Sequence, residues 1–484
     1  MKTTKIFFMA ALALMTVACS SDDNDIQTPA EQPAKSEGIP FTATISIGES
    51  ASTRALEEDG VNNKIVATWA TGEKVALIYT VGSTTYLKEA EVTPQAGGTA
   101  TISTTLEGSP VDNTDVTIVY PYSAVDESTK DVKTGLLDLQ NGLLTGPGSI
   151  AEKYELRKTT TPAKLKIDGT TASLKGTVAL TNLNAIFKFT LQDLSATDKS
   201  ATEFKVSDNS GSVITTVKPG SASDVLYVAL PAMGDGTYWF NATIDSKPYI
   251  AKATMAAATV AGKYYQTTVK MATVGDAILS NGKFATKGTS GQEAVIVYVG
   301  TVDKYFNHFL AIALEDAANN VNWSAAQTAI GTYAGKHPIT IGGTTYDNTN
   351  AWTSVYDVVS DNNATTSATA TTLHQGWRMP TVTDWRYLYA GIFGKSPTDP
   401  IGVNDGLDYY NTSSSGDDRS DIQNLVSGNI LKYYIGTGAP IYNTWFSSEV
   451  TGSTGYAWNY QPDYCDFYYG DKGTNLNVVA VFAY

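Results

Sequence analysis

Cysteine and histidine are scarce in this chain of 484 residues, which limits the chemistry that it can host. The sequence contains two cysteines, Cys19 and Cys465, and three histidines, at positions 308, 337 and 374. The histidines lie in no metal-ligand spacing, so a structural zinc site is not expected. The sequence also lacks a HExxH motif, a P-loop, a dinucleotide glycine fingerprint and a Ser-His-Asp order. We therefore predict no metal, no cofactor, no catalytic residue and no enzymatic activity.

Basic charge and long apolar runs are also in short supply. The 33 lysines and arginines are outnumbered by 48 acidic residues, which gives a net charge of −15 at neutral pH. A protein of that sign is not expected to bind nucleic acid or an anionic membrane through a basic face. The apolar run from Ile6 to Met15 is shorter than the roughly 20 residues that a transmembrane helix needs. These absences predict an exported protein that does not span the membrane.

The N-terminus has the order of a secretory signal peptide. Lys2 and Lys5 precede the apolar run and small residues follow it, so we expect residues 1–18 to be removed. Cys19 then resembles the acylated cysteine of a bacterial lipoprotein box, and the SSDDND after it resembles the export tag of surface lipoproteins from gut and oral Gram-negative bacteria. The resemblance implies a palmitate-type anchor at Cys19 and display on the outer membrane. A plain signal peptide with an incidental cysteine is the alternative.

Residues 19–38 form a polar segment after the signal peptide. They are rich in Ser, Asp, Asn, Gln, Pro, Glu and Lys and hold hardly any apolar side chain. Such a segment cannot bury enough apolar surface to offset the entropy lost on ordering it. We interpret it as a flexible tether between the lipid and the folded domains.

Alternating apolar and polar side chains begin at residue 39. FTATISI and NAIFKFTLQ both have the period-two pattern of a half-buried antiparallel strand. The residues predicted to point inward are Phe41, Ala43, Ile45 and Ile47 in the first and Ala185, Phe187, Phe189 and Leu191 in the second. Further short strands are expected in KVALIYT, VTIVYPY, VLYVALP, YWFNATI and YYQTTVKM. Their spacing predicts a mainly β protein with two β-sandwich domains, at residues 39–169 and 170–273.

Five segments in order resemble the fimbrillin-like proteins that build type V pili. They are STRALEEDG, ATWATGEKVALIY, VTIVYPY, LYVALPA and AGKYYQTTVKM. The resemblance covers residues 39–272 and implies two transthyretin-like sandwiches that assemble by donor-strand exchange with other fimbrillin subunits. A sandwich that lacks a strand exposes unpaired backbone groups and an apolar groove, so an incoming strand gains both hydrogen bonds and burial.

Arg54 and Ala55 match the processing site of that family. An arginine-specific protease that cuts between them would separate the first strand from the rest of the domain and release the lipid anchor. A loop arginine without a role is the alternative. Because the second sandwich leads into about 210 further residues, we also expect this protein to accept a strand and to donate none.

Residues 274–484 are expected to form an α+β domain. In PTVTDWRYLYAGIFG, Thr381 and Asp384 predict a capping box, and apolar residues follow at helical spacing. These apolar residues are Trp385, Leu388, Tyr389 and Ile392. NWSAAQTAIGTYAG and SDIQNLVSG are further helix candidates, whereas AWNYQPDYCDFYYG and NVVAVFAY predict strands.

The same region resembles the C-type-lectin-like domains found at the ends of bacterial surface proteins. The matching segments are HQGWRMPTVTDWRYL, WFSSE and YAWNY, with Met379 and Phe446 as departures from the usual pattern. The resemblance implies that Trp377 and Trp385 fill the core and that Pro380 starts the helix. A QPD tripeptide holds calcium in true C-type lectins, but here it comes after the Trp-Asn pair and no Asn-Asp pair follows it. We interpret it as a chance resemblance.

Several stretches of the C-terminal region combine tyrosine and tryptophan with small polar residues. Aromatic side chains supply large contact area at low entropic cost, and small polar residues adapt their hydrogen bonds to a ligand. The predicted ligand-binding surface consists of Tyr409, Tyr410, Trp445, Trp458, Tyr460, Tyr464 and Tyr468. The alternative is that about half of these tyrosines fill the core or an edge strand.

Three hypotheses about function follow. The first is a fimbrial tip or accessory adhesin that binds a glycan or a protein through its C-terminal domain. The second is an anchor or stalk subunit in which that domain is a structural cap. The third and least favoured is a surface enzyme that processes glycans.

Overall fold

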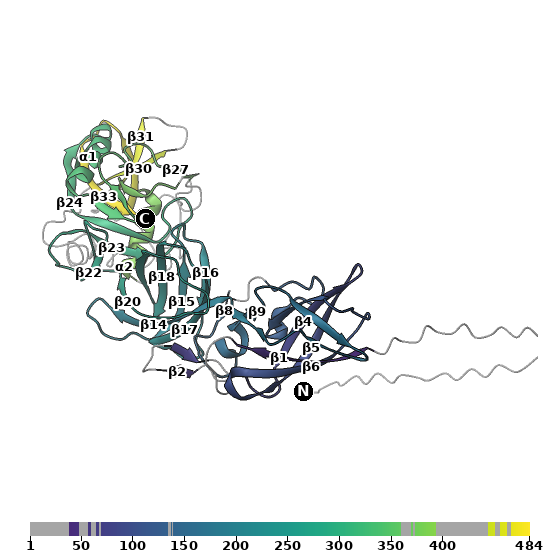
Figure 1. Ribbon diagram of the computed structural model, residues 1–484. Coiled ribbons are helices and arrows are strands. Elements are labelled where there is room, and N and C mark those ends of the chain that lie inside the picture. Colours follow the sequence, from purple (N-terminus) through teal and green to yellow (C-terminus); the bar gives the residue numbers. More distant parts are fainter. Residues whose placement is uncertain are drawn as a thin grey trace, which may run out of the picture.

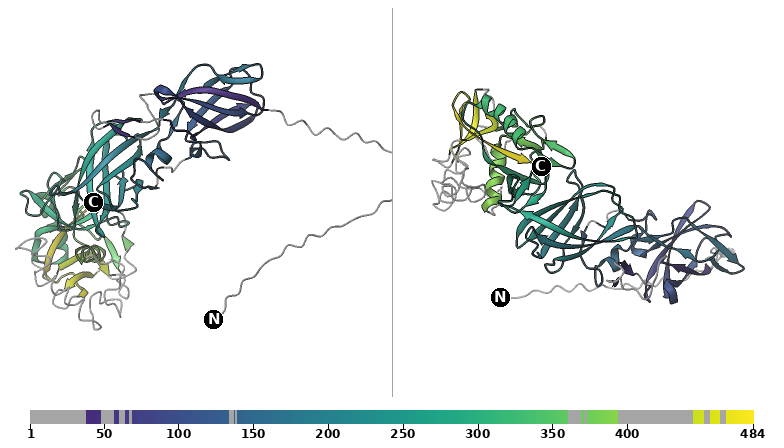
Figure 2. Two further views of the ribbon diagram at one scale, coloured as in Figure 1. Left: turned by 90° about the horizontal axis from the view of Figure 1, so that it is seen from below. Right: turned by 60° about the vertical axis from the view of Figure 1, so that its left-hand side comes forward.

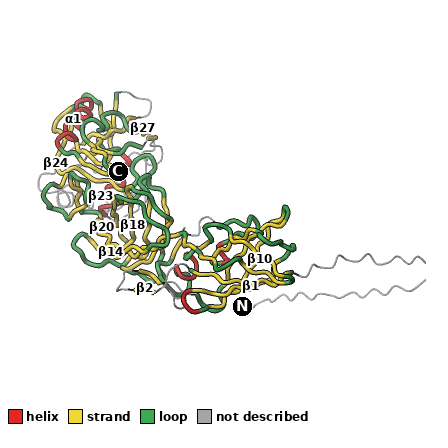
Figure 3. Tube along the Cα trace, in the orientation of Figure 1, coloured by secondary structure: helices red, strands yellow, loops and turns green. Residues whose placement is uncertain are grey.

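The computed structural model describes most of the chain from residue 38 onward. The described residues are 38–47, 57–59, 64–66, 69–133, 137, 139–359, 369–370, 373–393, 444–450, 455–461 and 466–484. Three β-rich domains follow one another in a bent row (Figures 1 and 2). Strands predominate throughout, as Figure 3 shows, which confirms the predicted mainly β class. Among the described residues, no helix has both the length and the apolar character needed to span a membrane.

The first domain is built on a sheet that closes on itself. The pairing order is β10–β11–β1–β6–β5–β4–β7, and β10 also pairs with β7, which completes the ring. The strands of this sheet are β1 (Ile39–Ser46), β4 (Lys74–Val81), β5 (Thr84–Pro94), β6 (Thr99–Leu106), β7 (Asp115–Tyr120), β9 (Arg157–Lys158), β10 (Ala163–Asp168), β11 (Thr171–Leu174), β12 (Val178–Ala179) and β13 (Thr181–Asn182). The other elements are the hairpin of β2 (Glu57–Asp59) and β3 (Lys64–Val66), the 3-10 turns η1 (Ala96–Gly98) and η2 (Tyr122–Ala124), and the π-helical turn η3 (Ile150–Tyr154).

The second domain has two layers of strands. One layer holds β17, β14 and β20, and the other holds β19, β18, β15, β16 and β8, with a short pairing between β19 and β20 at the end of the sandwich. The strands are β8 (Leu139–Gln140), β14 (Asn184–Asp193), β15 (Ala201–Ser207), β16 (Val213–Val217), β17 (Val225–Pro231), β18 (Gly236–Ile244), β19 (Lys247–Met255) and β20 (Tyr264–Thr273). The four inward residues predicted for β14 are all buried, because they pack in the hydrophobic core between the two layers.

The structure moves the boundary between these two domains. The predicted boundary at residues 169 and 170 falls in the turn between β10 and β11, which pair with each other. β12 and β13 also pair with strands of the first domain, so that domain continues to Asn182. The predicted boundary is therefore wrong, because the hairpin that it divides belongs to one sheet.

A strap from the first domain enters the second. β8 pairs in parallel with β16, and the buried side chain of Gln140 forms two hydrogen bonds with the backbone of Ala229 in β17. Its Nε2 donates to the carbonyl oxygen over 2.7 Å, and its Oε1 accepts from the amide over 2.9 Å. The amide side chain thus takes the place of a neighbouring strand at the edge of β17.

The third domain combines a mixed sheet with two α-helices. The helices are α1 (Trp323–Lys336) and α2 (Val382–Phe393). The strands are β21 (Ala277–Leu279), β22 (Phe284–Ala285), β23 (Gln292–Val299), β24 (Phe309–Val321), β25 (Ile339–Ile341), β26 (Thr344–Tyr346), β27 (Asp357–Val359), β28 (Thr369–Ala370), β29 (Gly376–Arg378), β30 (Thr444–Val450), β31 (Tyr456–Gln461), β32 (Asp466–Asp471) and β33 (Leu476–Ala483). This domain is α+β, as its sequence predicts.

The capping box predicted for α2 is confirmed. The Asp384 amide donates to the Thr381 hydroxyl over 2.8 Å, and the Thr381 amide donates to the Asp384 carboxylate over 2.9 Å. Trp385 and Leu388 are buried, as their helical spacing predicts, while the Tyr389 side chain lies outside the described residues. The predicted α1 is also present and is capped by Asn322, and the SDIQNLVSG segment lies outside the described residues.

Candidate functional site

The first strand occupies a seat in the ring of the first domain. This first-strand seat is formed by β6 on one side and by β11 and β12 on the other. All eight residues of β1 pair with β6 in antiparallel register, from Ile39 opposite Leu106 to Ser46 opposite Thr99. The pairings with β11 and β12 are parallel and involve Phe41, Ile45 and Ser46. The strand therefore has partners on both sides and does not lie at a free edge.

The inward face of β1 confirms the predicted alternation. Phe41, Ala43, Ile45 and Ile47 are buried in the core of the first domain, and Thr42 and Thr44 are exposed. Large and small residues alternate across the pair with β6, since Ala43 faces Ile102 and Ile45 faces Ala100. A shift by one residue would turn the apolar face of β1 outward, so this packing fixes the register of the strand.

A guanidinium group holds the C-terminal end of β1. Arg157 donates from Nη1 to the carbonyl oxygen of Ile47 over 2.7 Å. Its Nε and Nη2 contact Oε1 of Glu155 at 2.7 and 2.6 Å, and the Glu155 side chain is only 4% exposed. The amide of Leu180 adds a further hydrogen bond to the carbonyl oxygen of Ser46. Charge-assisted bonds of this kind are the stronger ones in proteins, so we name Arg157 and Glu155 the strand clasp.

We predict that Arg157→Ala weakens the seating of β1. The substitution removes the hydrogen bond to Ile47 and leaves the buried Glu155 carboxylate without its cation, which together should destabilise the first domain by about 2 to 3 kcal/mol. The check is hydrogen exchange of the β1 amides, which should become faster in the variant. Lys164→Ala breaks an exposed pair with Asp115 and is the matched control, expected to change little. If the β1 amides exchange at the same rate in Arg157→Ala and Lys164→Ala, Arg157 does not hold the strand and the prediction is wrong.

The residues predicted for lipidation and processing lie outside the described part of the chain. These are Cys19, Arg54 and Ala55. Their order relative to β1 is given by the sequence alone: Cys19 comes before the strand, and Arg54 follows it by eight residues. A cut after Arg54 would thus leave β1 held in its seat by non-covalent contacts alone.

The predicted aromatic surface of the C-terminal domain needs correction. Trp445 and Trp458 are completely buried, so they are not part of an exposed surface. The Trp445 Nε1 donates to the backbone of Val321, and its ring packs in the domain core. Tyr460 and Tyr468 lie in β31 and β32, where only the backbone is described, and Tyr409, Tyr410 and Tyr464 lie outside the described residues.

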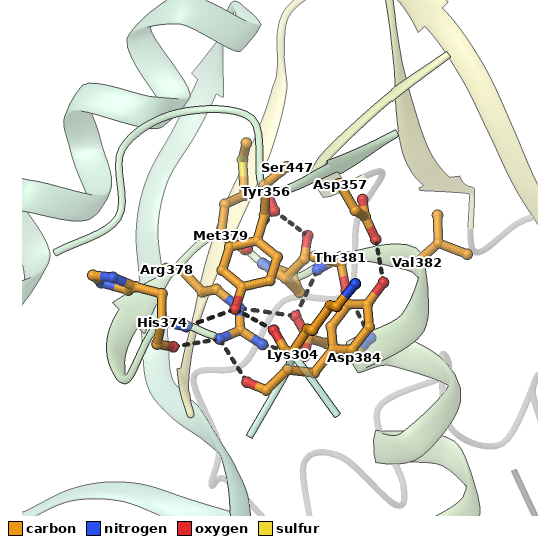
Figure 4. Close-up of polar contacts among 12 residues, drawn as sticks. Lys304, Tyr356, Asp357, His374, Arg378, Met379, Thr381, Val382, Asp384 and Ser447 are labelled. Carbon is orange, nitrogen blue, oxygen red and sulfur yellow. Dashed lines mark hydrogen bonds and ion pairs between the residues drawn. The ribbon is translucent and has the colours of Figure 1, made fainter. Parts of the chain in front are cut away.

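Arg378 forms the centre of a buried polar cluster beside α2 (Figure 4). Its Nη2 and Nε contact the two carboxylate oxygens of Asp384 at 2.6 and 3.1 Å, and both side chains are fully buried. Its Nη1 donates to the carbonyl oxygens of Tyr305 and His374, and its guanidinium lies 4.2 Å from the centre of the Tyr356 ring. The neighbouring Trp377 and Trp385 are buried, as the sequence predicts. All these groups are engaged within the protein, so the cluster is structural.

Asp357 belongs to this cluster, and its carboxyl has a raised pKa. It accepts a hydrogen bond from the Tyr305 hydroxyl at Oδ2, while Oδ1 has no partner among the described residues. Burial raises the pKa of Asp357 to about 6. The folded state therefore binds a proton that the unfolded state releases, and the stability that this proton provides is lost as the pH rises from about 4 to about 6.

We predict that Asp357→Asn removes this pH dependence. The variant should be more stable than the wild type at neutral pH and should lose that advantage near pH 4, because the amide carries no charge to desolvate. Urea unfolding at a series of pH values measures the difference. Asp347→Asn is a suitable control, because hydrogen bonds from Thr349 lower the pKa of Asp347 and reverse the expected sign. If the difference in the free energy of unfolding between Asp357→Asn and the wild type is the same at pH 4 and at neutral pH, the prediction is wrong.

The interface between the second and third domains is a feature that the sequence reasoning missed. Trp239 of β18 is completely buried although it lies on the outer face of its sandwich. His308 stacks on it at 4.0 Å between ring centres, and Tyr484 packs at 5.2 Å. The backbone amides of residues 307–309 all donate to the carbonyl oxygen of Tyr484. The sequence did contain one sign of this interface: in YWFNATI, Trp239 alternates with the inward Phe240 and Ala242, so a large apolar side chain points away from the core of its own sandwich.

No metal site is evident in the part of the chain that the structure describes, since no three His, Cys, Asp or Glu side chains gather there. The arrangement offers instead one seated strand and one tightly joined pair of domains. Both features are contacts between segments of this one chain.

Comparison with known proteins finds similarity in structures alone. No family model and no curated protein matches the chain. A fimbrial protein from Bacteroides ovatus is 11% identical, with 93% of this chain and 99% of that chain covered and a TM-score of 0.26. A fimbrial assembly protein from Parabacteroides distasonis is 12% identical over 48% of this chain and 90% of its own, with a TM-score of 0.24.

The tip fimbrial protein Mfa3 from Porphyromonas gingivalis, truncated at its C-terminus, is also similar. It is 11% identical over 48% of this chain and 98% of its own, with a TM-score of 0.25. The structural neighbours of this chain thus include fimbrial proteins. At these values neither their family nor their mode of assembly carries over to it.

Proposed function

We propose that the chain is a cell-surface fimbrial subunit, anchored through a lipid on Cys19 until a protease cuts after Arg54, and then assembled by exchange of its first strand. In this role it is a tip or accessory adhesin whose C-terminal domain binds a glycan or a protein on another surface. The partners in assembly are other fimbrillin-like subunits.

The observation that supports this proposal is the position of β1. The strand is paired along its whole length and buries Phe41, Ile45 and Ile47 in the core, yet it precedes Arg54 in the chain. Each large apolar side chain contributes about 1.5 to 3 kcal/mol when buried. A cut strand would therefore stay in its seat until a strand of similar pattern replaces it, which couples removal of the lipid tether to assembly.

The decisive experiment is Arg54→Ala in the expressing bacterium. We expect a protein that is folded, lipidated and exposed at the surface but absent from sheared fibres, because the tether is not cut. Arg157→Ala is a useful comparison, since it alters the seat and leaves the cleavage site intact. Should Arg54→Ala enter fibres at the wild-type level with Ala55 at its N-terminus, or should wild-type fibres retain Cys19, the proposal is wrong.

The adhesin role is tested separately with the full-length exported chain. Saturable binding to a component of a glycan array or of a host-protein array supports a ligand-binding C-terminal domain. Binding to fimbrial subunits alone would favour the anchor or stalk alternative, in which this domain is a cap.

A further inference from the structure

The C-terminal end of β1 lies next to the junction between the first and second domains. Ile47 belongs to the core cluster of the first domain, and this cluster also contains the buried Ile186 of β14 and Ala229 of β17. Two residues of the second domain thus help to close the core in which β1 is seated. β8 and β9 lie at the same junction (Figure 1). The first-strand seat and the junction are therefore parts of one packed region.

Residues 150–158 connect the first-strand seat to this junction, and we call them the junction segment. They comprise η3, both members of the strand clasp and β9. Arg157 donates to the carbonyl oxygen of Ile47, at the end of β1. Glu155 directly follows η3, and its amide donates to the carbonyl oxygen of Ile150 over 2.9 Å. The clasp that holds β1 is thus attached to η3 by a backbone hydrogen bond.

The junction segment also holds the strap, which consists of β8 and the residues that follow it up to Leu144. The amide of Ile150 donates to the carbonyl oxygen of Leu143 over 3.0 Å. The hydroxyl of Tyr154 donates to the carbonyl oxygen of Leu139. One turn of the chain, η3, therefore contacts the strap and supports the clasp of β1.

The junction segment is bonded in addition to the link between the two domains. The amide of Leu183 donates to the carbonyl oxygen of Leu156 over 2.8 Å. The side chain of Asn184, the first residue of β14, donates from Nδ2 to the carbonyl oxygen of Tyr154 over 2.9 Å. A displacement of η3 would therefore disturb the strap and the start of the second domain together.

The other side of the strap closes the open edge of the second domain. The carbonyl oxygen of Gln140 accepts from the amide of Lys218, which follows β16, over 2.8 Å. The carbonyl oxygen of Gly142 accepts from the amide of Tyr227 in β17 over 2.9 Å, and the Gln140 side chain bonds to Ala229. β16 and β17 belong to different layers, so the strap contacts both layers of the sandwich.

We propose that the junction segment couples the seating of β1 to the closure of the strap, so that each stabilises the other. When β1 leaves its seat, Arg157 loses its carbonyl partner and the shared core loses Ile47, which weakens the support of η3. Coupling between two sites is reciprocal, so release of the strap weakens the seating of β1 by the same factor. The coupling does not require a cut after Arg54 and is independent of the proposed fimbrial role.

The test substitutes a residue of the strap in the full exported chain and measures hydrogen exchange of the amides in β1. Gln140→Ala removes hydrogen bonds to Thr215 and Ala229 of the second domain. Among the described residues, Gln140 forms no hydrogen bond with β1, so a direct effect on the strand is not expected. We expect the β1 amides to exchange at least about fivefold faster than in the wild type, the lower end of the usual coupling between two sites.

Ile244→Ala is the matched control. Ile244 is buried in the core of the second domain and pairs with Ala201 at the start of β15, at the end of the sandwich remote from the first domain. The substitution destabilises the second domain without altering the strap. The exchange of the β1 amides should stay within about twofold of the wild type, as expected for distant and independent sites.

Tyr154→Phe provides a second, milder variant. It deletes the one oxygen that donates to Leu139 of the strap, and it takes the place of Gln140→Ala if circular dichroism shows that this variant is not folded. It should also speed the exchange of the β1 amides. Combined with Arg157→Ala, either strap variant should accelerate this exchange by a smaller factor than it does alone, because the clasp is already absent.

Three outcomes would overturn the proposal. In the first, the β1 amides exchange at the wild-type rate in the folded strap variants. In the second, Ile244→Ala accelerates them as much as the strap variants do, so the effect is a general loss of stability. In the third, a strap variant has the same effect with and without Arg157, which would mean that the clasp does not transmit it.

Discussion

Asp384→Ala should destabilise the third domain by about 3 to 5 kcal/mol, the usual cost of leaving one member of a buried ion pair without its partner. Arg378 is completely buried. Among the described residues, Asp384 is the only acidic side chain that forms a hydrogen bond with it. The same carboxylate accepts from the Thr381 amide at the start of α2. The substitution therefore removes charge compensation and helix capping together. Chemical denaturation, followed by a probe in this domain, measures the loss.

A double variant separates the two contributions. In Arg378→Met combined with Asp384→Leu, neither member of this ion pair is left without its partner, so a large part of the stability should return. It should not return fully, because the carbonyl oxygens of Tyr305 and His374 lose the Nη1 donor and α2 loses its cap. If the double variant is less stable than Asp384→Ala alone, the uncompensated charge is not the main cost.

Trp239→Ala has the other large expected effect, at the interface of the second and third domains. Truncation of a buried tryptophan costs about 3 to 5 kcal/mol, because the lost burial is joined by a cavity. Here the cavity would open between the His308 ring, stacked at 4.0 Å, and the Tyr484 ring at 5.2 Å. The hydrogen bond from Trp239 Nε1 to Asn209 Oδ1 is lost as well. We expect the two domains to unfold at separate denaturant concentrations.

Small-angle scattering and limited proteolysis test this expectation directly. The variant should show a wider distribution of dimensions and new cleavage near residues 273–277, where β20 ends and β21 begins. Trp352→Ala is the matched control, since its partly exposed ring packs within the third domain alone. Cooperative unfolding of Trp239→Ala, with the scattering profile of the wild type, would show that the interface does not depend on this ring.

Sequence reasoning succeeded where one local rule decides the outcome. The burial of Phe41 and Phe187 follows from the period of two along a strand that has a core on one face. The capping of α2 follows from Thr381 and Asp384 being three residues apart, which brings each side chain to the backbone amide of the other. Neither conclusion requires knowledge of distant parts of the chain.

Sequence reasoning failed where the burial of a side chain depends on segments that are distant in the chain. β30 is buried along both faces, so the polar Ser447 and Ser448 are as inaccessible as Trp445, and composition gave no sign of this. Trp239 likewise occupies an outward position in its own sandwich and is buried only by the following domain. The boundary near residue 169 was misplaced because pairing between β1 and β12 joins segments that are far apart in the chain.

The strap formed by β8 gives the chain a second mechanical connection between its first two domains. β13 ends at Asn182 and β14 begins at Asn184, so a pulling force along the backbone passes through a single intervening residue. The two hydrogen bonds between Gln140 and Ala229, together with the pairing of β8 with β16, span the same junction in parallel with that link. Bending of one domain against the other therefore has to break these contacts first. Under shear flow, the two domains would keep their relative orientation until the force is large enough to break these contacts. A linker without such contacts would let the domains reorient at any force.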